Sequence, residues 1–261
     1  MVENQNYGIS KITFLGTGTS TGVPQLGCGC EVCRSADPHD RRMRCSSLVE
    51  IGGARILIDC GPDFYFQMLH RPFAPFDAVL LTHEHYDHVG GLDDLRPYSI
   101  DVAEKIFCNT TTAKHIHERL PYCFKSTDIK RLPNLEMNVV NPHETFYVKD
   151  VPITPLRIFH GRMEILGYRI GGLAYITDMK TVPEEELRYI AGTKLLVVNA
   201  LRKKPHPTHQ SIGEAVGFAK QTGVPLVYFI HMSHEAGLHA ELEKELPENF
   251  HVAYDGLEVE F

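Results

Sequence analysis

The chain has 261 residues, of which 43% are hydrophobic and 23% are charged, and its formal net charge is −7. This composition is typical of a globular protein and argues against a disordered or fibrous one. The negative charge disfavours a long DNA or RNA partner, because nonspecific nucleic-acid affinity comes mostly from Lys and Arg that neutralise phosphates. The first residues lack the basic start and apolar stretch of a signal peptide, and no apolar run approaches the ~20 residues that span a bilayer. We therefore expect a cytoplasmic protein with no membrane partner.

Apolar and β-branched runs predict buried strands at Lys11–Leu15, Ser47–Ile51, Arg55–Asp59, Ala78–Thr82, Val151–Phe159, Leu173–Asp178, Lys194–Ala200 and Pro225–His231. Helices are predicted at Asp63–His70, Thr111–Leu120, Pro183–Ala191, Ser211–Thr222 and Leu238–Leu246. Ser211 and Glu214 form a capping box at the start of one helix, and Gly223 follows its end. The stretch Tyr122–Asp150 is predicted as a loop-rich excursion. Strands that first dominate and then alternate with helices favour an α/β fold, which we expect as one domain over residues 1–261.

The most informative segment is the predicted strand Ala78–Thr82, which runs straight into His83, His85, Asp87 and His88. Imidazole nitrogens and carboxylate oxygens suit zinc and similar divalent ions. Four such side chains at this spacing surround a site only if the backbone curls, and the Val-Gly-Gly that follows supplies the curl. The alternative interpretation is a polar loop that is merely rich in histidine. The spacing predicts a metal site.

Three further side chains, His160, Asp178 and His231, each follow an apolar run at its downstream end. Ligands of α/β sheets bind at the carboxyl ends of strands, so these separate runs can converge on one edge. Taken singly, each of the three is more commonly a structural residue than a ligand. Together with the first cluster they predict a single metal centre.

Three of the seven cysteines, Cys28, Cys30 and Cys33, lie within one turn. Tetrahedral zinc commonly takes three or four ligands at such short spacing. The fourth ligand must come from elsewhere, and His234 is the best candidate because it follows His231 by three residues. The alternative is a turn of free thiols. The remaining cysteines are predicted to be buried small apolar residues: Cys45, Cys60, Cys108 and Cys123.

The pattern His-x-His-x-Asp-His at 83–88 resembles the signature of the metallo-β-lactamase superfamily. The later His160, Asp178 and His231 are similar to its remaining metal-ligand motifs, and the turn Leu57–Gly61 resembles its first motif. The likeness covers nearly the whole chain. It implies a four-layer αβ/βα sandwich with two divalent metals, zinc or manganese, at one edge of the sheets.

The resemblance also implies a role for each ligand: His83, His85 and His160 hold one ion, Asp87, His88 and His231 hold the other, and Asp178 bridges both. Two divalent ions roughly 3.5–4 Å apart lower the pKa of water and neutralise charge on the attacking and leaving oxygens. Asp59 would orient a ligand or the catalytic water. Its alternative role is that of a strand-end acid that accepts hydrogen bonds from turn N–H groups.

A narrower likeness is to the PhnP-type phosphodiesterases, known for hydrolysing phosphoribosyl cyclic phosphate. It rests on the glycine-rich segment 14–24, the cysteine turn and the run from His231 to His234. It implies one structural zinc held by Cys28, Cys30, Cys33 and His234. It also implies a catalytic histidine within 205–209, where His209 is the better match and His206 the alternative. An imidazole there would help to expel an alkoxide from phosphorus, with Asp87 as the second catalytic side chain.

Two open points concern the neighbourhood of this histidine and of the cysteine turn. His209 could instead cap the helix that follows it. The run Arg41, Arg42 and Arg44 is a candidate for holding a second phosphate, but a run of charge more commonly marks a solvated surface.

We therefore predict a binuclear-metal phosphodiesterase that hydrolyses a small, cyclic phosphodiester to a phosphomonoester, with a homodimer suggested by the resemblance. The alternatives are a tRNA-processing endonuclease of the same superfamily, a lactone or thioester hydrolase, and a noncatalytic metal carrier. The net charge of −7 argues against the endonuclease, and the presence of every superfamily ligand argues against the carrier. Mixed imidazole and carboxylate ligands do not choose between zinc, manganese and iron.

Overall fold

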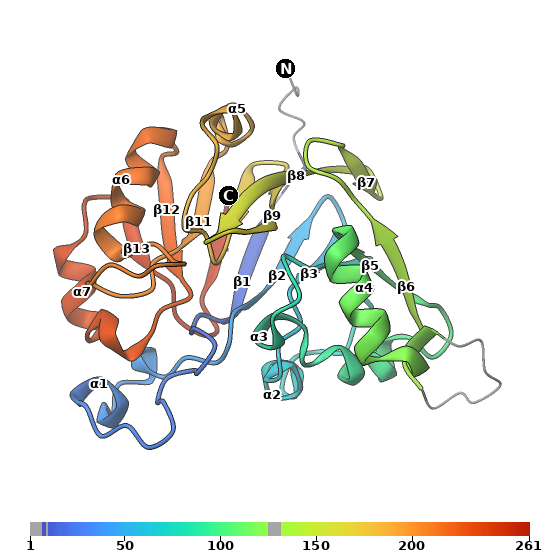
Figure 1. Ribbon diagram of the computed structural model, residues 1–261, viewed down its shortest axis with the longest axis horizontal. Helices are drawn as coiled ribbons and strands as arrows, with labels where there is room; N and C mark the ends of the chain where they lie inside the picture. The colour runs from blue at the N-terminus through green and yellow to red at the C-terminus, as the bar shows by residue number, and fades with distance from the viewer. Residues whose placement is uncertain (1–6, 9, 125–131) are drawn as a thin grey trace.

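The computed structural model describes residues 7–8, 10–124 and 132–261. Two β-sheets pack face to face, and helices cover the outer side of each sheet (Figure 1). This arrangement is the αβ/βα sandwich that the sequence predicts. Within the described ranges, no helix is both long and apolar enough to cross a membrane.

The first sheet carries the early part of the chain. Its strands are β1 (Lys11–Gly16), β2 (Ser46–Ile51), β3 (Ala54–Ile58), β4 (Ala78–Leu80), β5 (Glu104–Cys108), β6 (Leu135–Val139) and β14 (Glu258–Glu260), in the order β14-β1-β2-β3-β4-β5-β6. Strands β3 to β6 are parallel to one another. The outer side packs against α2 (Phe64–Met68), α3 (Tyr86–Val89), the 3-10 helix Leu92–Tyr98 and α4 (Thr110–Arg119).

The second sheet carries the later part. Its strands are β7 (Phe146–Val148), β8 (Val151–His160), β9 (Met163–Ile170), β10 (Leu173–Ile176), β11 (Leu195–Asn199), β12 (Leu226–Ile230) and β13 (Phe250–Val252), in the order β13-β12-β11-β10-β9-β8-β7. Its outer side packs against α5 (Leu187–Ile190), α6 (Ile212–Thr222) and α7 (His239–Glu245). The capping box of α6 is confirmed, since Ser211 and Glu214 bond reciprocally. Gly223 ends the helix with φ 67°, a conformation that favours glycine.

The main core lies between the two sheets and is built from fully buried aliphatic and aromatic side chains. Val49 and Ile56 of the first sheet share this core with Tyr168 and Val197 of the second, and each of the four is 0% exposed. Burial of each such side chain stabilises the fold by roughly 1.5–3 kcal/mol. The Tyr168 hydroxyl donates a 2.7 Å hydrogen bond to the backbone oxygen of Leu81, so it ties the second sheet to the segment that leads into the metal-ligand motif.

The prediction of a loop-rich excursion over Tyr122–Asp150 is wrong for much of this stretch. It contains β6 and β7, and a 3-10 helix, Pro121–Phe124, precedes them; residues 125–131 lie outside the described ranges. Only Leu135 of strand β6 is buried, and the other four residues are accessible at the edge of the sheet, which explains its polar sequence. The helix predicted at Pro183–Ala191 is divided into a 3-10 turn, Glu184–Glu186, and the short helix α5.

Four strands determine where the functional side chains gather. Strands β4, β8, β10 and β12 each end at or just before a predicted metal ligand: His83, His160, Asp178 and His231. The short helix α1 (Glu31–Arg34) and the 3-10 helices Pro38–Asp40 and His234–Ala236 lie in the adjoining segments of the cysteine turn and the last ligand loop.

Candidate metal centre and active site

The structure brings the predicted ligands from both sheets together. The ligand atoms of Asp87, His88, Asp178 and His231 all lie within 4.8 Å of one another. Those of His160, Asp178 and His209 form a second group with the same spacing. Asp178 belongs to both groups, which places its carboxylate at the middle of the centre.

Individual distances bear out the central position of Asp178. Its Oδ2 atom lies 3.2 Å from His88 Nε2, and its Oδ1 atom lies 3.2 Å from His231 Nε2. Asp87 Oδ2 also lies 3.2 Å from His88 Nε2. Each oxygen of the Asp178 carboxylate thus lies close to a different histidine, which is the arrangement that a bridging ligand would need.

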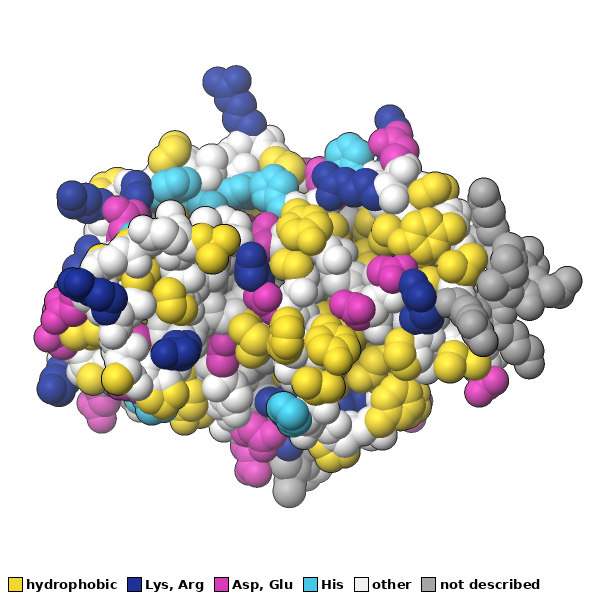
Figure 2. Space-filling view, turned by 90° about the horizontal axis from the view of Figure 1, so that it is seen from below, with side chains coloured by type: hydrophobic (Ala, Val, Ile, Leu, Met, Phe, Trp, Pro, Cys, Tyr) yellow, Lys and Arg dark blue, Asp and Glu magenta, His cyan; other side chains and the backbone are white. Residues whose placement is uncertain are grey.

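His83 and His85 lie beside this cluster on the side of His160. The ring centroids of His83 and His85 are 4.6 Å apart, and that of His160 lies 5.2 Å from His85 and 5.9 Å from His83. Figure 2 shows histidine side chains gathered in a row on this face of the molecule, with basic and hydrophobic side chains nearby. All the predicted catalytic-metal ligands are thus found in one neighbourhood.

Unpaired nitrogen atoms show that these residues fit divalent ions. The Nε2 atoms of His83, His88 and His231 are buried, and none makes a well-oriented hydrogen bond in the described part of the chain, although carboxylate oxygens lie 3.2 Å from those of His88 and His231. Leaving a buried polar group without a partner costs about 1–3 kcal/mol, so such groups need an explanation. Imidazole nitrogens that face carboxylates across a short gap are the donor set of a divalent metal pair.

The ligands are themselves held by a layer of hydrogen bonds. Asp59 Oδ2 lies 2.7 Å from His88 Nδ1, and Thr82 bonds to Asp59 through both its backbone N–H and its hydroxyl. The Thr82 hydroxyl also lies 3.0 Å from Nδ1 of His83. Asp59 thus makes both kinds of contact considered from the sequence, because it bonds to a candidate ligand and also accepts the backbone N–H of Thr82. The sequence analysis missed Thr82, although it stands directly before His83.

His160 is oriented by two backbone carbonyl groups. Its Nδ1 atom lies 2.9 Å from the backbone oxygens of both Asp178 and Thr208. Carbonyl oxygens only accept hydrogen bonds, so Nδ1 of His160 carries the proton and Nε2 is free to bind a metal. No sequence motif signals Thr208, because its backbone oxygen makes the contact.

The charged side chains of this centre shift one another's pKa values. Burial opposes the charged form of His88, but Asp178 and Asp87 outweigh it and raise the pKa of His88 well above its ordinary value. Burial likewise opposes the charge of Asp178, but His231 and His88 outweigh it and lower its pKa well below the usual range. The carboxylates thus stay ionised, which is the form that binds metal.

Three residues of the centre have left-handed backbone conformations. The φ angles of Asp59, Asp178 and His231 are 57°, 54° and 57°, all unusual for residues other than glycine. Such strain is tolerated where the surrounding structure fixes the backbone, and it is concentrated at functional sites. Each residue follows the end of a strand, so the turn there directs its side chain into the centre.

The histidine loop after β11 reaches the centre through His209. Its Nε2 atom lies 3.0 Å from Asp178 Oδ1, whereas His206 contacts His209 and Thr208. Ser211 is the N-cap of α6, so the alternative in which His209 caps this helix is wrong. Burial lowers the pKa of His209 to about 4, although its hydrogen bond to Asp178 acts in the opposite direction.

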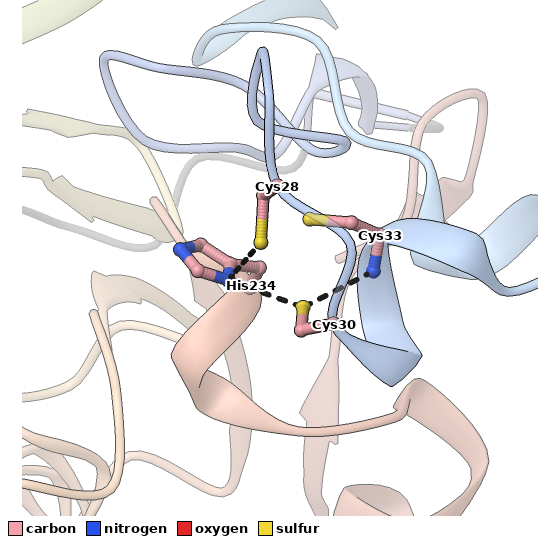
Figure 3. A group of neighbouring side chains, drawn as sticks. All are labelled: Cys28, Cys30, Cys33 and His234. Carbon is pink, nitrogen blue, oxygen red and sulfur yellow. Dashed lines mark hydrogen bonds between the residues drawn. The ribbon is translucent and has the colours of Figure 1, made fainter.

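The cysteine turn and the last ligand loop form a second cluster. The Sγ atoms of Cys28 and Cys30 lie 3.5 and 3.3 Å from His234 Nδ1, and Cys33 completes a group whose ligand atoms are all within 4.8 Å (Figure 3). Three thiols and one imidazole at this spacing fit a tetrahedral zinc ion. His234 also brings this cluster close in sequence to His231 of the first centre.

Backbone N–H groups donate hydrogen bonds to two of the three thiols of this cluster. The N–H of Cys33 donates to Cys30 Sγ, and this bond and His234 lower the pKa of Cys30 to about 6. The N–H of Gln25 donates to Cys33 Sγ, but burial dominates there and raises the pKa of Cys33 to about 11. As predicted, the other four cysteines are buried free thiols: Cys45, Cys60, Cys108 and Cys123.

The arginine run after the cysteine turn has structural contacts. Arg42 is buried, and its guanidinium donates to the Thr17 hydroxyl and the Ala253 backbone oxygen. Arg44 pairs with Asp63 at 2.9 Å. Arg42 is therefore not part of a solvated face, and neither pattern of contacts points to a phosphate.

Two solved structures resemble the whole chain. A crystal structure described as a new diphosphatase from the PhnP family has a TM-score of 0.90 and 38% identity, and the match covers 97% of this chain and 98% of that one. Zn²⁺-bound PqqB from Methylobacterium extorquens has a TM-score of 0.77 and 21% identity over 96% of this chain and 100% of that one, which supports the fold.

One relative is longer than this chain. A Porphyromonas gingivalis protein named Octanoyltransferase is 48% identical over 247 residues, which are 94% of this chain and 50% of that protein. The chain thus spans about half the length of this relative. The Beta-lactamase superfamily domain matches residues 54–232, a range that holds every predicted ligand of the catalytic metals. From its sequence, its fold and its Asp/His cluster, the chain belongs to the beta-lactamase superfamily.

Proposed function

We propose that this protein is a binuclear-metal phosphodiesterase that hydrolyses a small, cyclic phosphodiester to a phosphomonoester. The observation that carries the proposal is the position of His209. Its Nε2 atom lies 3.0 Å from Asp178, and it comes from a loop that carries none of the seven candidate metal ligands. An imidazole there is placed to assist a departing oxygen through an N–H hydrogen bond. The 38% identity to a PhnP-family diphosphatase over nearly the whole chain supports cleavage of a phosphorus–oxygen bond.

Each part of the centre then has a task. His83, His85 and His160 would hold one divalent ion, Asp87, His88 and His231 would hold the other, and Asp178 would bridge them. When bound, the pair supplies a water of lowered pKa and positive charge beside the nonbridging oxygens of the phosphate. The chain itself fixes the ligands through Asp59 and Thr82, and the neutral His209 would offer an N–H hydrogen bond to the departing oxygen. The Cys28, Cys30, Cys33 and His234 cluster would hold a structural zinc.

A second candidate reaction is cleavage of a diphosphate bond, which the description of the PhnP-family neighbour as a diphosphatase favours. The same centre suits both reactions, because each moves a phosphoryl group from one oxygen to another. A third candidate, hydrolysis of an acyl thioester, is favoured only by the name of the Porphyromonas gingivalis relative, half of whose length lies outside the match.

A substrate panel separates these candidates. The purified protein, loaded with Zn²⁺ or Mn²⁺, is assayed on ribose 1,2-cyclic phosphate, bis(p-nitrophenyl) phosphate, a nucleoside diphosphate sugar, octanoyl thioester and precursor tRNA. The proposal expects the highest kcat/KM on the cyclic phosphate. A higher value on the diphosphate, the thioester or the tRNA would replace the proposal by the corresponding candidate, and metal binding without any turnover would favour the carrier.

The proposal also includes a cytoplasmic location and a homodimer. The homodimer rests on the family resemblance, and light scattering of the purified protein at several concentrations tests it. A mass of one chain, 29.5 kDa, at all concentrations would contradict it.

A further inference from the structure

Glu84 stands between two candidate metal ligands, His83 and His85, but its carboxylate contacts α4 instead of the metal centre. The side chain is buried, with 7% exposure, and it belongs to none of the groups of neighbouring metal-binding side chains in the described part of the chain. Residues 81–85 form neither a strand nor a helix. Contacts outside regular secondary structure must therefore hold this segment in place.

Three side chains of α4 contact Glu84. The Thr112 hydroxyl donates to Glu84 Oε2 at 3.1 Å, and His115 Nδ1 lies 3.2 Å from Oε1. The Arg119 guanidinium donates to the Glu84 backbone oxygen at 2.8 Å. Helix positions three and four residues apart share a face, so the three contacts come from one side of α4. They hold both the carboxylate and the backbone of Glu84.

The helix that makes these contacts is itself fixed. The side chain of Asn109 caps its start and accepts the N–H of Thr112 at 2.8 Å. Ile116, which is 1% exposed, belongs to the same buried cluster as Leu81. Since Leu81 begins the segment that leads into the metal-ligand motif, α4 packs against the segment that it also hydrogen-bonds. A site supported by such a rigid element keeps its geometry.

We propose that Glu84 is a positioning residue that docks the segment of His83 and His85 on α4. This docking sets the separation of the two imidazoles, whose ring centroids are 4.6 Å apart, for the ion that they would hold together with His160. The inference rests on the metal pair of the proposed function but not on its substrate. We call the position of this ion the three-histidine position.

The other position of the metal pair has separate support. Asp87 and His88 lie in α3, and Asp59 lies 2.7 Å from His88. His231 comes from the end of β12 in the other sheet. Loss of the contacts between Glu84 and α4 is therefore expected to weaken the three-histidine position selectively.

Zinc binding to Glu84→Ala protein tests this role. Competition with a chelator measures the affinity of each ion, and anomalous diffraction at the zinc edge gives the occupancy of each position in crystals at graded zinc concentrations. The affinity of the three-histidine position is expected to fall about 10-fold to 100-fold, as it does when a side chain that orients a metal ligand is lost. The other position and the cysteine cluster are expected to keep their zinc at the same concentrations.

A conservative variant and a matched control keep the test specific. Glu84→Gln retains an oxygen that accepts from Thr112, and it is expected to recover most of the affinity. Glu118→Ala truncates an exposed acid of the same helix, with a side chain 60% exposed, and should bind zinc as the wild type does. If Glu84→Ala does not fold, Arg119→Gln removes one contact alone and should cause a smaller loss at the same position.

The outcome is measured without turnover. A purely structural role for Glu84 would lower Tm and weaken both positions of the pair equally. Equal loss at the two positions, or wild-type affinity in Glu84→Ala, would overturn the positioning role. A wild-type protein that binds both ions but cleaves no phosphodiester would refute the proposed function alone, and one that leaves the three-histidine position empty would overturn both.

Discussion

Asp59 Oδ2 lies 2.7 Å from His88 Nδ1, and both side chains are fully buried beneath the metal centre. A carboxylate in this position fixes the ring orientation of a histidine ligand and leaves Nε2 for the metal. It accounts for a fully buried acid beside a candidate metal ligand.

The first prediction concerns this pair. Asp59→Asn keeps the shape of the side chain but removes its negative charge, so metal affinity should fall about 10-fold to 100-fold. Competition with a chelator of known affinity measures the change. Glu185→Gln, which alters an exposed acid, is the matched control. An Asp59→Asn protein with wild-type affinity would show that the pair has no orienting role.

The second prediction concerns the central ligand. Asp178→Ala removes the carboxylate that both ligand groups share, and turnover should fall at least about 10³-fold because the charge that both ions bind is gone. His83→Ala should behave in the same way. Circular dichroism should show that both proteins remain folded. Turnover by metal-free Asp178→Ala protein at the wild-type rate would contradict metal catalysis.

The third prediction separates the two metal clusters. Cys30→Ala should lose one zinc per chain and lower Tm by at least about 5 °C, since 1 kcal/mol corresponds to roughly 2–4 °C in a domain of this size. Cys123→Ala is the control, because it truncates a buried thiol far from His234 and should lower Tm without loss of zinc. Metal analysis together with thermal unfolding decides, and an unchanged Tm and zinc content in Cys30→Ala would exclude a structural zinc there.

The fourth prediction is a pH dependence. Glu104 is 4% exposed, and burial, followed by repulsion from Asp77, raises its pKa to about 7 from 4.5. The folded state therefore keeps a proton that the unfolded state loses, so stability falls as pH rises from about 4.5 to about 7. Glu104→Gln removes this penalty and should raise the free energy of unfolding at pH 8 by about 3 kcal/mol, with no gain at pH 4. Urea denaturation at both values checks it. An equal effect at the two pH values would contradict the raised pKa.

The gathering of the candidate ligands could be predicted because their positions in the sequence reflect the topology. His160, Asp178 and His231 each end a buried strand, and the carboxyl ends of β8, β10 and β12 meet at one edge. Strands such as β6 and β9 were not predicted, because they do not read as continuous apolar runs. The sequence of β9 is interrupted by Gly167, yet eight of its residues pair with β8 through a tight turn at Gly161.

What holds the ligands in place was harder to predict. Two backbone oxygens orient His160, and a backbone N–H donates to His206. Every residue has these groups, so only the path of the chain decides where they act. The sequence left open which of His206 and His209 reaches the metal centre. In the structure His209 contacts Asp178, and His206 contacts His209.

The left-handed backbone at Asp59, Asp178 and His231 limits how this protein can be engineered for heat resistance. Glycine relaxes a residue with positive φ, so a replacement by glycine at any of these three positions would relieve backbone strain. Each of them, however, carries a side chain that the catalytic centre needs. Selection for thermal tolerance alone would therefore accept changes that destroy catalysis, and a screen must measure turnover and melting together.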